Sequence, residues 1–99
     1  MIIVAGTIRV PPENMEVIRP HARRVIEATR GEAGCVVYSF AEDLLDPGLI
    51  RIYEIWESRE HLDAHGRAPH MDPWRAAVAA NGVMERDVKA FQAGPGEPL

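Results

Sequence analysis

The sequence contains only one cysteine, Cys35, so no disulfide bond can form within the chain. A lone cysteine is consistent with a reducing compartment, and we expect the protein to lie in the cytoplasm. Positive charge is also scarce, because 11 lysines and arginines stand against 15 aspartates and glutamates and give a formal net charge of -4. This balance argues against DNA, RNA or an anionic membrane as a partner.

The sequence also lacks a long hydrophobic run. The apolar start, MIIVAGTIRV, has no basic residues before it and is interrupted by Thr7 and Arg9. This pattern is typical of a strand and not of a signal peptide or a membrane span. No repeat or linker divides the chain, and 99 residues suffice for one hydrophobic core. We therefore expect one domain over residues 1–93 and a flexible tail over residues 94–99.

Hydrophobic periodicity predicts four strands, over residues 2–10, 34–42, 49–57 and 83–93. In the second strand, simple alternation puts Cys35, Val37 and Ser39 on one face and Val36, Tyr38 and Phe40 on the other. The segment DLLDPG that follows carries the residues typical of a turn.

The same pattern predicts two helical regions. Apolar residues at three- and four-residue steps indicate a first helix from PPEN to Gly31, with a kink at Pro20 because proline cannot donate to the preceding turn. A second helical region begins after Ser58, which is a good N-cap residue. It is interrupted at Pro69 and begins again at Asp72.

The order of elements is β-α-β-β-α-β, which is typical of a ferredoxin-like α+β fold with a four-stranded antiparallel sheet and both helical regions on one face. The strands nevertheless carry apolar residues on both faces. Leaving a whole sheet face in water costs several kcal/mol at ~25 cal/mol per Å². We therefore expect a homodimer in which a second copy covers this face.

Three segments carry a resemblance to a known family: IVAGTIRVPPE near the start, EAGCVVY at residues 32–38 and EIWESREHLDAHGRAPHM at residues 54–71. The chain resembles the antibiotic biosynthesis monooxygenases, and among them the small quinol monooxygenases. The resemblance implies a dimeric α/β barrel with an apolar pocket between sheet and helices. It also implies oxidation of a quinol or polyphenol by O2, without flavin, haem or metal.

A related branch of this family degrades haem. Aligning the pattern puts Thr7, His65 and Arg75 at the positions of its asparagine, tryptophan and histidine. Because arginine cannot serve as a neutral axial ligand to iron, the sequence argues against haem degradation. The alignment also implies that His65 faces the pocket.

Three of the four histidines lie in HLDAHGRAPH, at His61, His65 and His70. His61 and His65 have the one-turn spacing of metal ligands, yet no further ligand lies at a typical spacing and Asp63 belongs to another helix face. We expect no metal, a solvated His61 and catalytic roles for His65 and His70. Proton transfer by His65 competes with a role as an ordinary buried side chain, and His70 could instead fix the helix break.

Four further residues are candidates for substrate binding: Thr7, Tyr53, Trp74 and Arg75. Glu54 on the third strand is either a buried base or a partner of Arg51 or Arg86, and we favour the ion pair. The main hypothesis is a cofactor-independent monooxygenase acting on a quinol. The alternatives are an isomerase that works by proton transfer and a non-catalytic dimeric module that binds a small ligand.

Overall fold

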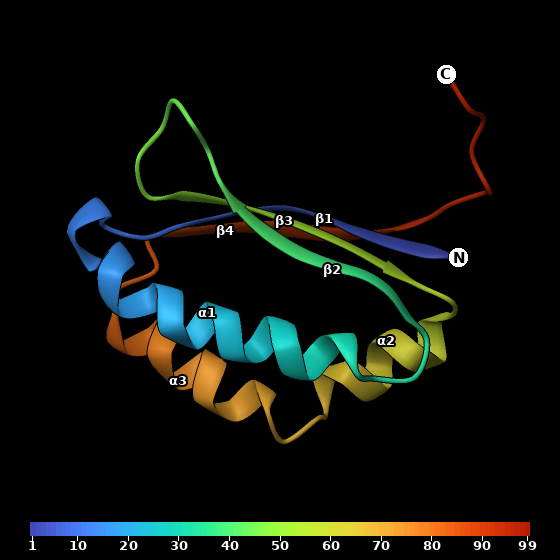
Figure 1. The fold of residues 1–99 in the computed structure, drawn as a ribbon, viewed down its shortest axis with the longest axis horizontal. Coiled ribbons are helices and arrows are strands. Elements are labelled where there is room, and N and C mark those ends of the chain that lie inside the picture. The colour runs from blue at the N-terminus through green and yellow to red at the C-terminus, as the bar shows by residue number, and fades with distance from the viewer.

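Four antiparallel strands form one sheet in the order β2-β3-β1-β4, and all the helices lie on one of its faces (Figure 1). The computed structural model describes all 99 residues. The predicted ferredoxin-like order is confirmed, and the elements are β1 (Ile2–Arg9), a 3-10 turn (Pro12–Asn14), α1 (Met15–Arg30), β2 (Cys35–Glu42), β3 (Leu49–Trp56), α2 (Arg59–Gly66), α3 (Met71–Ala80) and β4 (Glu85–Gln92). None of the helices combines the length and the apolar character needed to cross a membrane.

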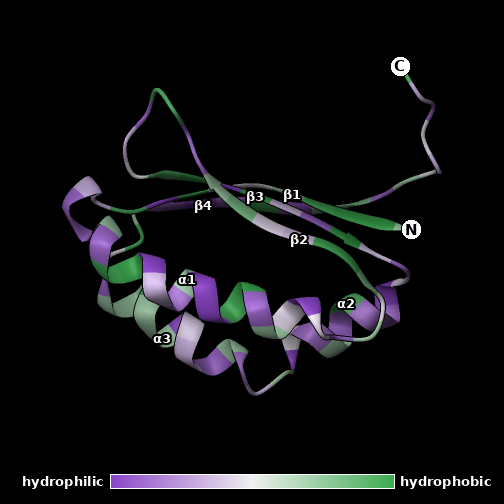
Figure 2. Ribbon diagram, viewed as in Figure 1, coloured by the Kyte–Doolittle hydropathy of each residue, from purple (hydrophilic) through white to green (hydrophobic).

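The core lies between the sheet and the helices. Every second residue of the central strands β1 and β3 points toward the helices, and these positions hold buried side chains such as Ile8, Ile52 and Trp56. They pack with Ile18 of α1 and other apolar residues of the helix layer. Figure 2 shows the resulting alternation of apolar and polar residues along the helices. This two-residue and 3.6-residue patterning is what the sequence predicted.

The second strand departs from simple alternation. Cys35 pairs with Trp56 and Val37 pairs with Ile55, so Val36 is an extra residue in a β-bulge. The bulge leaves Val36 51% exposed and turns Cys35 toward the helices, against the buried cluster that contains Tyr38. The expectation that Cys35 shares a face with Val37 is therefore wrong.

The first helix runs as one α-helix through Pro20, where we expected a kink. Pro20 and Glu16, the residue whose carbonyl would accept the missing hydrogen bond, are both exposed. Water can satisfy that carbonyl, so the lost bond does not break the helix. The predicted end at Gly31 is confirmed.

The second helical region is broken at Pro69, as predicted. Ser58 caps α2, because its Oγ accepts a hydrogen bond from the backbone N–H of His61 at 3.2 Å. The second piece, α3, begins at Met71 and not after a cap at Asp72. His70 occupies the N-cap position without a capping bond from its side chain, which bonds to other groups.

The face of the sheet away from the helices is open. Its residues include a row that crosses all four strands in register: Val37, Ile55, Ile3 and Phe91. The β2–β3 loop and the C-terminal tail both extend on this side of the sheet (Figure 1). The observed apolar row agrees with the sequence pattern behind the dimer hypothesis, and the dimer itself stays a prediction.

Candidate functional site

A cavity of about 300 Å³ lies between the sheet and the helices α2 and α3. Nine of the 14 residues that line it are hydrophobic, and they include Phe40 and Trp74, whose rings lie 5.4 Å apart. The polar side chains at the cavity belong to Glu54, His65, Arg75 and Arg86. Small-molecule sites commonly have this character, with apolar walls and a few polar groups, and volumes of about 300–1,000 Å³. The cavity therefore suits a small aromatic molecule.

His65 is held rigidly at this cavity. It lies on α2, is only 5% exposed, and its ring packs against Trp56 and Tyr38 with centroid distances of 4.8 and 5.2 Å. Its Nδ1 lies 2.7 Å from Oε2 of Glu32. No buried side-chain nitrogen or oxygen lacks a hydrogen-bond partner, and His65 makes its side-chain hydrogen bond through Nδ1. Nε2 is therefore open to the cavity.

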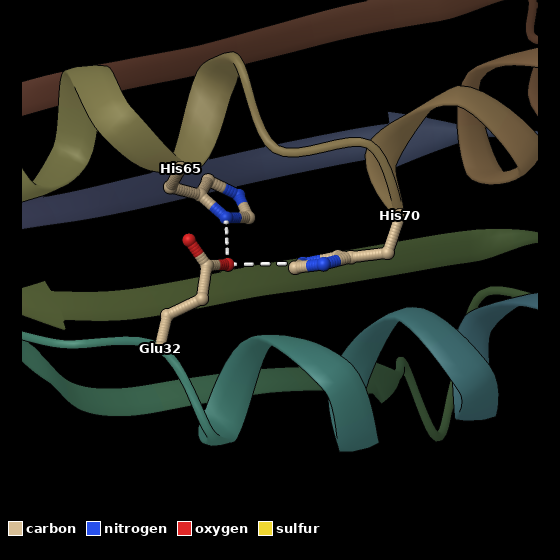
Figure 3. A group of neighbouring side chains, drawn as sticks. All are labelled: Glu32, His65 and His70. Atoms are coloured by element: carbon tan, nitrogen blue, oxygen red, sulfur yellow. Dashed lines mark hydrogen bonds and ion pairs between the residues drawn. The ribbon is translucent and has the colours of Figure 1, made fainter.

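Glu32 connects His65 to His70 (Figure 3). It lies in the loop between α1 and β2, and the same oxygen, Oε2, is 3.0 Å from Nε2 of His70. That nitrogen is also 3.2 Å from Oγ1 of Thr29, which is fully buried on α1. His70 does not line the cavity and reaches His65 only through Glu32.

Glu32, His65 and His70 are also the one group of three metal-ligating side chains whose donor atoms lie within 4.8 Å of one another. Ligand atoms around a tetrahedral zinc ion, bonded at about 2.0–2.1 Å, stand about 3.3 Å apart. The separations of 2.7 and 3.0 Å to Oε2 are shorter and are typical of direct hydrogen bonds. The donor set could supply three ligands, but its geometry favours a hydrogen-bonded network.

His61 and Asp63 lie apart from this network. Nδ1 of His61 is 2.7 Å from Oγ of Ser58, so His61 supports the start of α2 and is not simply solvated as we expected. Asp63 forms an ion pair with Arg59 at 3.1 Å on the outer side of α2. The expected separation of Asp63 from His65 is confirmed.

Glu54 faces the cavity and is 7% exposed. The indole N–H of Trp56 donates to its Oε1 at 2.9 Å. Burial raises the pKa of Glu54 and outweighs this hydrogen bond. The salt bridge that we favoured does not form, because Arg51 bonds to Asp43 on the other face, and Arg86 acts on Glu54 only through its charge, which lowers the pKa of Glu54.

Tyr38 is a further titratable group beside His65. Burial raises the pKa of its phenol above the usual value, with a smaller contribution from the charge of Glu54. Tyr38 therefore stays neutral over the physiological range and is not a candidate for the base.

The structure brings together only some of the residues singled out in the sequence. His65, Trp74 and Arg75 line the cavity, and Nη2 of Arg75 donates to the carbonyl of Gly66 at 2.6 Å. Thr7 and Tyr53 do not line it, and their placement at this site is corrected. Strand alternation turns both of them to the open face, where Tyr53 is 46% exposed.

Glu32 is the member of the site that the sequence did not indicate. It is 33 residues from His65 and 38 from His70, and it lies in a loop. Neither helical spacing nor strand alternation relates such positions. The only local signal was its place in the segment EAGCVVY, which carries part of the family resemblance.

Comparison with known proteins identifies the family to which this chain belongs. Residues 1–77 match the family model described as antibiotic biosynthesis monooxygenase. The Synechocystis protein sll1783, which is uncharacterised, is 38% identical over 69 residues, which are 70% of this chain but 47% of that protein. The probable quinol monooxygenase YgiN of Escherichia coli is 28% identical over 104 residues, with 95% of this chain and 99% of YgiN covered.

A solved structure gives the same result. The crystal structure of a Deinococcus radiodurans protein with the same family description superposes with a TM-score of 0.92 at 28% identity, over 100% of this chain and 98% of that one. The family-model match covers most of the chain and includes His65 and Trp74. The chain therefore belongs to the antibiotic biosynthesis monooxygenase family.

Proposed function

We propose that the protein is a cofactor-independent monooxygenase that oxidises a quinol or related polyphenol with O2, and that the reaction takes place in the cavity beside His65. The observation that carries this proposal is the buried His65 ring, whose free Nε2 meets a largely apolar cavity. The family membership and the similarity to YgiN support it. A cytoplasmic location, where Cys35 remains a thiol, is part of the same proposal.

The first step is removal of a phenolic proton by Nε2 of His65. A phenol has a pKa of ~10 and is mostly protonated at neutral pH, so a positioned base is needed. Phe40 and Trp74 supply an aromatic wall for the ring, and the guanidinium groups of Arg75 and Arg86 supply positive charge near the phenolate. The anion formed in this way is a strong reductant.

The deprotonated quinol then passes one electron to O2, and the two radicals combine to form a carbon–oxygen bond. Loss of water from the resulting hydroperoxide leaves a hydroxyquinone. One oxygen atom enters the ring, the other leaves as water, and the quinol supplies all four electrons. The balance therefore needs no further reductant, and the apolar cavity protects the intermediates from solvent.

The test uses 1,4-dihydroxynaphthalene and ¹⁸O2, with the enzyme-free oxidation rate subtracted. We expect one ¹⁸O atom in the product and no turnover under argon. Turnover under argon to a product of unchanged mass would instead identify an isomerase. Binding of the quinol without turnover would identify a non-catalytic module.

The base is tested by His65→Ala, with His21→Ala as the matched control. General-base catalysis contributes about 100–10,000-fold, so we expect kcat of His65→Ala to fall by about two decades or more. His21 is half-buried on α1, where its Nδ1 lies 3.4 Å from Nη1 of Arg24, and it does not line the cavity. Its removal should change kcat by less than about threefold, or ~0.7 kcal/mol. Equal kcat values for both variants and the wild type would refute the role of His65.

A further inference from the structure

We infer that Glu32 is a positioning residue that fixes the tautomer of His65, and that His70 holds Glu32 in place for this task. The inference rests on the proposed function in one respect, because it takes His65 as the base. Its structural part, the tautomer, can be measured without any substrate. It assigns roles to a loop carboxylate and to a histidine that does not line the cavity.

The tautomer follows from the hydrogen bonds of one oxygen atom. Oε2 of Glu32 is 2.7 Å from Nδ1 of His65 and 3.0 Å from Nε2 of His70. An ionised carboxylate can only accept hydrogen bonds, so each of these ring nitrogens must carry a proton. A neutral imidazole has a single N–H, and Nε2 of His65 is therefore left with its lone pair.

The orientation of that lone pair is fixed by packing. The His65 ring packs against both Trp56 and Tyr38, which resist its rotation. With Nδ1 directed to Glu32, the ring presents Nε2 to the cavity. In the opposite tautomer Nε2 would carry the proton and could not accept one from a phenol.

His70 explains why Glu32 stays in this position. Glu32 lies in the short loop after α1, and a single hydrogen bond to His65 would leave its side chain free to swing away. The N–H of His70 gives the same oxygen a second donor from a different direction (Figure 3). Oγ1 of Thr29, buried on α1, lies 3.2 Å from that nitrogen and holds the His70 ring in turn.

Glu32 also serves the charge that develops during turnover. When His65 accepts the phenolic proton its ring becomes positive in a buried place. A carboxylate at 2.7 Å stabilises that cation, as in other catalytic histidine–carboxylate pairs. Glu32 never contacts the substrate in this scheme, because it does not line the cavity.

The tautomer is tested directly by long-range ¹H–¹⁵N NMR of the histidine rings in the full chain, without ligand. We expect His65 to carry its proton on Nδ1 and His70 on Nε2 at neutral pH. His65 with its proton on Nε2 would overturn the inference. Because this measurement uses the wild type, it decides the point even if a variant fails to fold.

Two variants of Glu32 distinguish the effect of its hydrogen-bond acceptor on His65 from the effect of its negative charge. Glu32→Gln keeps an oxygen acceptor but removes the charge, so we expect the His65 tautomer to persist and kcat to fall by about tenfold. Glu32→Ala removes both, so we expect a mixture of His65 tautomers and a larger fall in kcat, with KM for 1,4-dihydroxynaphthalene changing less. Glu27→Gln, at an exposed position of α1, is the matched control and should behave as the wild type.

The outcomes distinguish this inference from the proposed function. If His65→Ala abolishes turnover while Glu32→Ala keeps both the wild-type kcat and a single His65 tautomer, only the inference fails. If His65→Ala keeps full turnover, the proposed role of His65 as the base fails, and the NMR result alone then decides whether Glu32 fixes the ring.

Discussion

At the scale of single residues, the buried carboxyl of Glu54 has a measurable consequence. Burial raises the pKa of Glu54 in the folded protein above its ordinary value of 4.5, while the unfolded chain keeps the ordinary value. At a pH between the ordinary pKa of Glu54 in the unfolded chain and its raised pKa in the folded protein, the folded state binds more protons than the unfolded state. The free energy of unfolding therefore falls as the pH rises from 4.5 through this window.

Glu54→Gln should remove this component, because an amide does not ionise. We expect the wild type to lose stability relative to Glu54→Gln as the pH rises from 4.5 through the raised pKa of Glu54, measured by urea unfolding at each pH. Glu57→Gln, three residues along and exposed, is the control and should keep the pH dependence of the wild type. A stability difference between the wild type and Glu54→Gln that does not change with pH would contradict the burial argument.

The sequence predicted part of the candidate site at this scale. His65 lies at the cavity, as its place in the alignment implied, and Trp74 and Arg75 lie with it. Thr7 was misplaced because alignment says which residues correspond but not which face a strand turns inward, and Tyr53 was chosen for its aromatic ring without regard to its face. Glu32 was missed because a contact between a loop and a helix 33 residues away leaves no local pattern.

At the scale of elements, the turn between β2 and β3 depends on Gly48. Its φ is +89°, a conformation that residues with a Cβ rarely adopt, and its carbonyl accepts a hydrogen bond from Val10 N–H at 3.0 Å. A Cβ at this position would overlap the carbonyl oxygen of Val10, which is backbone and cannot move aside cheaply. The turn therefore requires glycine for two independent reasons.

Gly48→Ala should destabilise the fold by about 1–3 kcal/mol. For a domain of this size that corresponds to a fall in Tm of roughly 5 °C or more, measured by thermal unfolding followed by circular dichroism. Gly94→Ala in the tail is the control, since nothing lies within 4 Å of the place that its new methyl group would take, and its Tm should match the wild type. An unchanged Tm for Gly48→Ala would mean that the loop rearranges without cost.

The elements also show where a pattern in the sequence is informative and where it is not. Helix ends at Ser58, Pro69 and Gly31 were predictable because each depends on the chemistry of one residue. The bulge at Val36 was not, because one extra residue leaves the strand apolar and changes only its register. Pro20 was misjudged because its effect depends on whether the unpaired carbonyl meets water.

At the scale of the whole molecule, the sheet has one covered face and one open face. On the open face Val37, Ile55, Ile3 and Phe91 stand side by side across the four strands, and Phe91 is 51% exposed. An apolar row of this kind on an open sheet face is costly in water. A second copy that presents the same row would remove it from solvent on both chains, in a symmetric contact.

We expect light scattering on a sizing column to give about twice the 11.0 kDa chain mass at micromolar concentration. Phe91→Glu places a charge at the end of the apolar row and should shift the protein toward the monomer, because a buried unpaired carboxylate opposes association. Val17→Glu is the matched control, since Val17 is 53% exposed on α1, away from the open face, and should leave the mass unchanged. A wild type that elutes as a monomer would mean that this face stays in water, and equal masses for the two variants would place the interface elsewhere.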